Sequence, residues 1–178
     1  MGEPVKQLSR TDLTGMRCSA TFSDDMAHRY HLLWRWSDAP ALTAWMLNPS
    51  TATHEVLDPT IAGLVKRARL WGFGGVAVVN LFGVRATDPR DMMKHHNPIG
   101  ADNDTMIRLA LLAAREDGTP IVCGWGRYGT HLQRQEAAFR LAKKADVPLM
   151  ALQLNADGTP QHPLYIKHDV RPMLWRPA

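Results

Sequence analysis

The chain has 178 residues, of which 45% are hydrophobic and 21% charged, and these values are typical of one globular domain. No apolar run approaches the roughly 20 residues of a membrane span, and the N-terminus lacks the apolar core of a signal peptide. We therefore expect a soluble, cytoplasmic protein without a membrane partner.

Charge and metal-ligand spacing narrow the choice of partners. The formal charge of +4 favours a polyanionic partner, DNA or a nucleotide, only modestly. The 8 histidines and 2 cysteines show no zinc-site spacing and no disulfide framework. We expect neither a metal nor a cofactor, and the composition leaves the oligomeric state open.

The elements follow an alternating order along the chain. A polar N-terminal arm over 1–16 precedes a single α/β domain over 17–178. Period-2 alternation predicts two edge strands, paired as a hairpin across the turn at 23–25, over 18–22 and 30–36. Four compact apolar runs predict buried strands over 42–47, 76–79, 121–123 and 149–154. Helical patterns between them predict helices over 59–70, 100–114 and 131–144.

Strands that alternate with helices predict a parallel sheet covered by helices on both faces. The expected fold is a three-layer α/β/α sandwich, with a central, mostly parallel sheet of about four strands plus the N-terminal edge strands. Ligands bind such sheets in a crevice outside the carboxyl ends of the strands. Polar residues that follow the buried strands are therefore candidate site residues.

The first candidate cluster follows the strand over 42–47. Asn48 emerges from the strand and is suited to position a water or a ligand carbonyl, while Pro49 stiffens the turn. Ser50, Thr51 and Asp58 add polar groups that suit a substrate, Ser50 and Thr51 for an anionic part of it. The alternative is that these residues are turn formers only.

The second cluster follows the strand over 76–79. Asn80 offers a donor and an acceptor, which suits the edge of a pyrimidine or amide ring. Phe82 is a candidate to stack on a planar ligand, and Arg85 is a candidate for a positive rim. A hydrogen bond from Asn80 to a neighbouring loop backbone is an equally good interpretation.

Two further segments complete the candidate crevice. Trp125 stands between glycines whose spacing matches neither a Rossmann nor a Walker motif, and packing explains it better than ligand stacking. His162 precedes a proline and is suited to donate to a carbonyl oxygen that gains charge during bond cleavage. Tyr165 lies in the same segment.

These blocks resemble a family catalogued as domain of unknown function 1643, over roughly residues 20–176. The resemblance rests on Trp45-Met46-Leu47-Asn48-Pro49-Ser50-Thr51-Ala52, Asp58-Pro59-Thr60-Ile61, Trp71-Gly72-Phe73-Gly74, Val79-Asn80-Leu81-Phe82, Arg85-Ala86-Thr87-Asp88-Pro89 and His162-Pro163-Leu164-Tyr165. The family name implies no activity.

The order of blocks is more distantly similar to the uracil-DNA glycosylase superfamily. That resemblance implies a uracil-DNA-glycosylase-like fold with a pocket for a base flipped out of DNA. It assigns water positioning to Asn48, base reading to Asn80 and carbonyl polarisation to His162. Asn48 stands where the fastest members have a carboxylate, and Leu164 stands where their loop serine would be.

Three functions remain open from the sequence. The first is a DNA glycosylase-like hydrolase that cleaves the N-glycosidic bond of a base, possibly a modified pyrimidine, in DNA. The second is a non-catalytic protein that binds a nucleotide or a modified base in the same crevice. The third is a small-molecule enzyme with no nucleic-acid partner.

Overall fold

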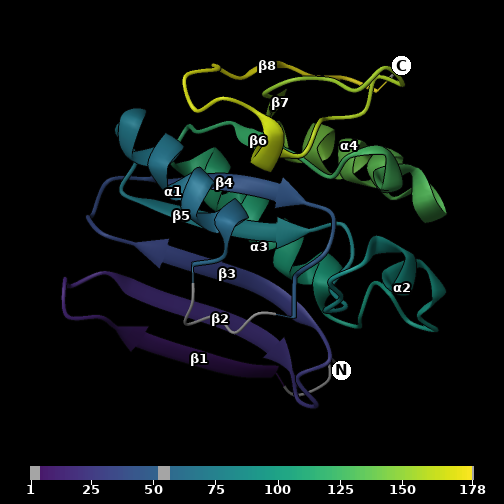
Figure 1. The fold of residues 1–178 in the computed structure, drawn as a ribbon, viewed down its shortest axis with the longest axis horizontal. Coiled ribbons are helices and arrows are strands. Elements are labelled where there is room, and N and C mark those ends of the chain that lie inside the picture. Colours follow the sequence, from purple (N-terminus) through teal and green to yellow (C-terminus); the bar gives the residue numbers. More distant parts are fainter. Residues whose placement is uncertain (1–4, 52–56, 178) are drawn as a thin grey trace.

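A computed structural model describes residues 5–51 and 57–177 of the chain. Its centre is an eight-stranded sheet with the order β1-β2-β3-β5-β4-β6-β7-β8 (Figure 1). The strands are β1 (Val5–Thr11), β2 (Arg17–Ser23), β3 (Arg29–Arg35), β4 (Ala41–Met46), β5 (Gly75–Asn80), β6 (Ile121–Cys123), β7 (Leu149–Ala151) and β8 (Met173–Leu174). The mixed α/β class is as predicted.

The size and direction of the sheet differ from the prediction. Parallel pairing joins β5 to β4, β4 to β6 and β6 to β7. The other pairings, β1 with β2, β2 with β3, β3 with β5 and β7 with β8, are antiparallel. The sheet is therefore larger than the predicted four strands plus N-terminal edge strands, and most of its pairings are antiparallel, because antiparallel strands extend it at both edges.

The N-terminal region contributes more strands than the sequence pattern indicates. Residues 5–11, inside the predicted polar arm, form β1 and pair with β2 along their whole length. The predicted hairpin of β2 and β3 is present, but neither is an edge strand, because β2 also pairs with β1 and β3 also pairs with β5. The short strand β8 had no periodic signal, since it contains only Met173–Leu174.

The helices pack on the two faces of the sheet. They are α1 (Pro59–Leu70), α2 (Pro89–Lys94), α3 (Asn103–Glu116) and α4 (Arg134–Ala145), with short 3₁₀ helices η1 (Arg127–Gln133) and η2 (Pro163–Tyr165). One apolar cluster joins α1 to a face of β2–β5, and another joins α3 and α4 to the opposite face (Figure 1). No helix in the described part of the chain combines the length and the apolar character needed to cross a membrane.

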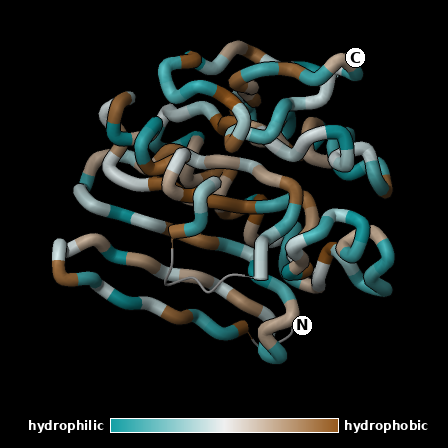
Figure 2. The backbone as a smooth tube through the Cα atoms, viewed as in Figure 1, coloured by the Kyte–Doolittle hydropathy of each residue, from teal (hydrophilic) through white to brown (hydrophobic). Residues whose placement is uncertain are grey.

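The apolar core explains the long buried runs of the sequence. All six residues of β4 and all six of β5 are buried, and Figure 2 shows apolar segments gathered in the middle of the sheet. On the α3–α4 side, Trp125 makes edge-on contacts with Trp45 and Trp175 at ring distances of 5.9 and 5.2 Å. Three tryptophans thus connect β4, the end of β6 and the C-terminal segment.

The start of α1 follows directly from its sequence. Asp58 caps the helix, because its Oδ1 accepts a hydrogen bond from the backbone N–H of Ile61 at 2.9 Å. Pro59 occupies the first turn, where its missing N–H leaves no donor unpaired. Since Asp58 also belongs to the first candidate cluster, the cap places the helix start beside the end of β4.

Arg67 attaches the segment that carries His162 to α1. Its side chain is 1% exposed, and its Nη2 donates to the carbonyl oxygens of Pro163, Ile166 and Lys167. These carbonyls pair with its Nη atoms, and they lose their donor if the side chain is removed. The single side chain thus fixes η2 against the helix.

We expect Arg67→Met to lower the free energy of unfolding by about 1–3 kcal/mol, because buried carbonyl groups lose their donor. Urea denaturation followed by circular dichroism measures this change. Lys66→Met is the matched control, since Lys66 is the exposed neighbour on the same helix. Equal stability of the two variants would contradict the role assigned to Arg67.

Candidate functional site

A cavity of about 220 Å³, here called the inner cavity, lies at the carboxyl ends of β4 and β5 on the α1 face. Six residues predicted from the sequence line it: Asn48, Pro49, Ser50, Asp58, Asn80 and His162. A larger cavity of about 700 Å³, here called the outer cavity, adjoins it and shares Leu47, Thr87, Pro89 and His162. The two cavities together form one crevice.

Strand register explains why the two asparagines share the inner cavity. In the parallel pair of β4 and β5, Met46 lies opposite Asn80. Side chains of a strand alternate between faces, so Asn80 continues the row of Val78, which packs on the α1 side. Asn48 follows Met46 by two residues and therefore continues the corresponding row of β4.

The side chain of Asn48 is held by its amide nitrogen. Nδ2 donates to the carbonyl oxygen of Ala86 at 2.8 Å and to that of Pro49 at 3.0 Å. No described residue donates a hydrogen bond to its Oδ1. Because Asn48 is only half-buried and lines the inner cavity, this oxygen is available to accept a hydrogen bond from a water or a ligand.

The loop after β4 is braced by its own polar groups. Ser50 Oγ donates to Asp58 Oδ2 at 3.2 Å, and the hydroxyls of Thr51 and Thr87 are 2.9 Å apart. Arg85 donates to the carbonyl oxygen of Thr51 at 2.7 Å. Thr51 and Arg85 are not among the residues that line either cavity. They support the loop that presents Asn48.

Asn80 is the buried polar group of the inner cavity. Its side chain is 3% exposed, and no described residue forms a hydrogen bond with its amide. Its backbone carbonyl is satisfied separately, because Asn103 Nδ2 donates to it at 3.0 Å. The hydrogen bond to a neighbouring loop, which the sequence left open, is therefore absent among the described residues. An amide in this state can pair with a group that offers both a donor and an acceptor.

His162 borders both cavities. Its Nδ1 accepts a hydrogen bond from the backbone N–H of Leu164 at 3.3 Å, which caps η2. Burial lowers the pKa of His162 below its ordinary value, although the Asp58 carboxylate acts in the opposite direction. The ring is therefore neutral near pH 7, and because Nδ1 is an acceptor, Nε2 carries the proton.

The three predicted aromatic residues do not share one place. Tyr165 is exposed and lines the outer cavity, with its ring centroid 6.1 Å from that of His162. Trp125 also lines the outer cavity, but it is 1% exposed and its Nε1 donates to Gln135, as a packing residue would. Phe82 is fully buried in the α3–α4 core, and the structure does not bring it to the crevice.

Arg29 is a charged lining residue that the sequence interpretation missed. It begins β3, is 4% exposed and lines the inner cavity. A register shift makes Phe22 pair with Arg29, whereas Thr21 pairs with His31. Directly paired residues share a face, so this bulge turns Arg29 to the α1 side, where Phe22 packs. Alternation along the sequence gives no signal of such a bulge.

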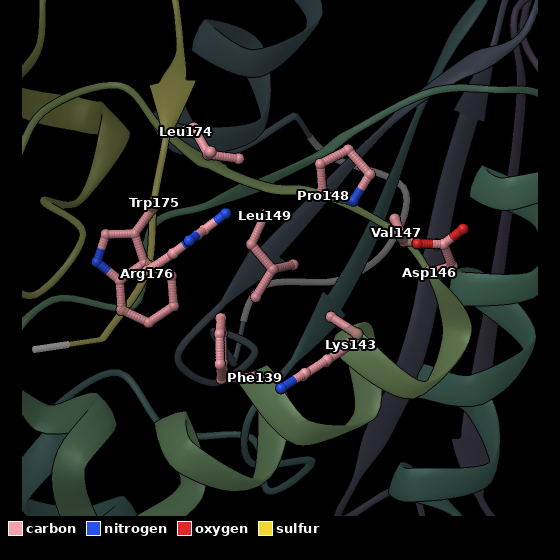
Figure 3. Close-up of a pocket in the computed structure, with 10 residues that line it drawn as sticks. Phe139, Lys143, Asp146, Val147, Pro148, Leu149, Leu174, Trp175 and Arg176 are labelled. Atoms are coloured by element: carbon pink, nitrogen blue, oxygen red, sulfur yellow. The ribbon is translucent and has the colours of Figure 1, made fainter.

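A separate cavity lies away from the candidate crevice. It has a volume of about 380 Å³ and lies between the end of α4, β7 and the C-terminal segment (Figure 3). Phe139 and Lys143 of α4 border it together with Leu149 and Leu174, and it holds none of the predicted site residues. Within residues 5–51 and 57–177, no three His, Cys, Asp or Glu side chains are grouped as metal ligands.

Comparisons with known proteins agree with the family suggested by the motifs. No curated protein matches the chain. The family described as protein of unknown function (DUF1643) matches residues 29–164, which include β3 to β7, α1 to α4 and, except for Tyr165, every residue discussed above that lines the inner or the outer cavity. Since this match covers most of the sequence, the chain belongs to the DUF1643 family.

Proposed function

We propose that the crevice binds a nucleobase and that the protein hydrolyses the N-glycosidic bond of that base in DNA. The observation that carries the proposal is that Asn48, Asn80 and His162, which come from three distant parts of the chain, line one cavity. At about 220 Å³ this cavity is smaller than the roughly 300–1,000 Å³ of drug-sized ligand sites. It suits one heterocyclic ring that has left the DNA stack.

Base recognition is assigned to Asn80. Its buried amide can donate through Nδ2 and accept through Oδ1 at the same time. A pyrimidine presents such a donor–acceptor pair on its Watson–Crick edge. A ligand without that pair would leave a buried amide unsatisfied, and this penalty would discriminate between bases.

Water positioning is assigned to Asn48. The amide group is fixed through Nδ2, so the direction of Oδ1 is also fixed. An amide oxygen accepts a hydrogen bond from water but is too weak a base to remove its proton. The proposed reaction therefore depends on orientation of the water and on departure of the base, more than on deprotonation of the nucleophile.

Stabilisation of the departing base is assigned to His162. A neutral imidazole with its proton on Nε2 can donate to a carbonyl oxygen of the base as negative charge develops there. The hydrogen bond from Leu164 to Nδ1 holds this tautomer, and the attachment of η2 by Arg67 holds the segment. The outer cavity, with Tyr165 and Arg127 on its border, is the proposed path of the DNA strand.

The same proposal includes a three-layer, uracil-DNA-glycosylase-like fold. Support comes from the helices on both faces of the parallel strands β5-β4-β6-β7 and from the crevice at their carboxyl ends. A base-binding protein without catalysis is the second candidate. The amide at position 48, in place of a carboxylate, favours it.

The two candidate functions are distinguished by incubating the protein with a panel of oligonucleotides that each carry one modified base. Alkali then cleaves the DNA at any abasic site, so strand cleavage measures turnover. We expect Asn48→Ala and His162→Ala to bind the substrate that the parent cleaves but to lose turnover. For His162→Ala the expected loss is about 10²–10³-fold, because one preorganised donor is removed.

His168→Ala is the matched control, since this histidine lies beside α1 and outside the crevice. Thermal unfolding of each variant shows whether a loss of turnover reflects folding. Full turnover by both folded crevice variants would refute the mechanism, and binding without product by the parent would favour the non-catalytic candidate.

The pH profile tests the protonation state of His162. Because burial lowers the pKa of His162, the ring stays neutral at pH values somewhat below the ordinary histidine pKa. Only the neutral ring can keep Nδ1 as a hydrogen-bond acceptor. We expect kcat/KM to stay constant as pH falls to 6.5 and then to decrease as the pH passes the lowered pKa. A profile that rises as His162 becomes protonated would show that the cationic ring is the active form.

Salt dependence tests the DNA path. We expect DNA binding to weaken as salt rises, and Arg127→Gln to reduce the slope of log K against log salt by about 1. Arg127 is exposed on the border of the outer cavity. Arg108→Gln, on the exposed side of α3, is the control and should leave the slope unchanged. Equal slopes for the parent and Arg127→Gln would contradict the proposed path of DNA along the outer cavity.

A further inference from the structure

Three arginines are buried in the part of the chain that the structure describes, and their surroundings differ. Arg67 donates to four backbone carbonyls, and Arg134 donates to the carbonyl of Leu81 and forms an ion pair with Asp104. Arg29 is 4% exposed, yet no hydrogen bond or ion pair joins its guanidinium to any described residue. Its buried Nε, like that of Arg67, has no partner among the described residues.

Arg29 remains a cation in this environment. Burial lowers the pKa of Arg29 to about 10, and the nearby Arg85 contributes to the decrease, but the group stays protonated at neutral pH. A buried charge without a partner costs several kcal/mol in general terms, so it is retained where a ligand supplies the partner. Arg29 thus supplies the cation of an ion pair whose anion is absent among the described residues.

The nearest acid does not complete the pair. Asp58 acts on Arg29 at long range only, because no ion pair within 4.0 Å joins them in the described part of the chain. Its two oxygens are already used, one by the N–H of Ile61 and one by Ser50 Oγ. Asp58 is therefore a helix cap, and Arg29, which lines the inner cavity, has no counterion among the described residues.

We propose that Arg29 binds a compact two-oxygen anion, a carboxylate or a phosphate, of the ligand that occupies the inner cavity. This proposal rests on the proposed function because both place the ligand in the inner cavity. It does not require that the ligand is hydrolysed. A planar guanidinium presents two parallel N–H donors, which match two oxygens of such an anion. Asn80, in the same cavity, reads a neutral edge of the same ligand.

This assignment narrows the class of substrate. A ring that carries a carboxylate would place it on Arg29, next to the ring edge that Asn80 reads. A nucleotide would instead place its phosphate there. An unmodified neutral pyrimidine would leave the buried charge without a partner, and we expect it to bind more weakly than either anion.

Stability without ligand is the first part of the test. We expect Arg29→Met to raise Tm, because an unpaired buried charge is replaced by an apolar side chain of similar length. Arg134→Met is the matched control and should lower Tm, since a buried pair is broken. A decrease in Tm of Arg29→Met equal to that of Arg134→Met would overturn the proposal, because Arg29 would then have a structural role.

Binding to the full chain, measured by calorimetry without DNA, is the second part. The probes are orthophosphate, uracil-5-carboxylate and neutral uracil. We expect one of the two anions to bind more tightly than uracil, and Arg29→Met to weaken that binding by about 10- to 100-fold while binding uracil as the parent does. Tighter binding of uracil-5-carboxylate identifies a ring carboxylate, and tighter binding of orthophosphate identifies a phosphate.

Two results would overturn the anion site: neither anion binds the parent, or Arg29→Met binds both anions as the parent does. Failure of the proposed function gives a different result. If Arg29-dependent binding occurs but no oligonucleotide is cleaved, the anion site stands and hydrolysis does not. If a neutral base is cleaved equally by the parent and Arg29→Met, hydrolysis stands and the anion site does not.

Discussion

The parallel pairing of β4 with β5 on one side and with β6 on the other is the constraint on which the crevice depends. Parallel strands end at the same edge of the sheet, so the residues that follow them meet there. Pairing continues past the strands: the N–H groups of Leu81 and Gly124 donate to the carbonyls of Met46 and Trp45 at 2.9 Å. The crevice is therefore built on backbone that is already hydrogen-bonded.

Polar groups around the crevice divide into two sets. Those of the supporting loops are paired with each other: Ser50 with Asp58, Thr51 with Thr87, and Asn48 Nδ2 with Ala86. Arg29 and Asn80 are more deeply buried, yet no hydrogen bond joins their side chains to a described residue, and Nε of Arg29 is a buried atom without a partner there. A buried polar group without a partner lowers stability, so such groups are expected where a ligand completes them. The inner cavity has this arrangement: hydrogen-bonded loops surround it, and the side chains of Arg29 and Asn80 line it without a partner among the described residues.

Tertiary contacts from distant segments close the crevice. Arg67 of α1 attaches η2 and with it His162, which is 95 residues away in the sequence. Arg85 attaches the loop after β4 to the β2–β3 connection through the carbonyls of Thr51 and Met26. These arginines act on backbone carbonyls, and their effect on the site is positional. They explain why a site made from several short motifs can hold one geometry.

The sequence by itself determined the elements with strong local signals. The strand over Ile121–Cys123 and the helix over Pro59–Leu70 match the predicted ranges, because an apolar run and a capped, proline-started helix are local patterns. It also determined that Asn48 and Asn80 follow buried strands, from which a shared crevice could be expected. The edge strands β1 and β8 had no such signal, since one is largely polar and exposed and the other has two residues.

Tertiary structure alone decided which side chains face the cavity. Phe82 follows Asn80 by two residues but packs on the opposite side of the sheet, because the strand ends at Asn80 and its alternation ends with it. Arg29 enters the cavity only because a bulge between β2 and β3 changes the face of its side chain. Register and bulges depend on contacts between strands that are distant in sequence, so no local pattern encodes them.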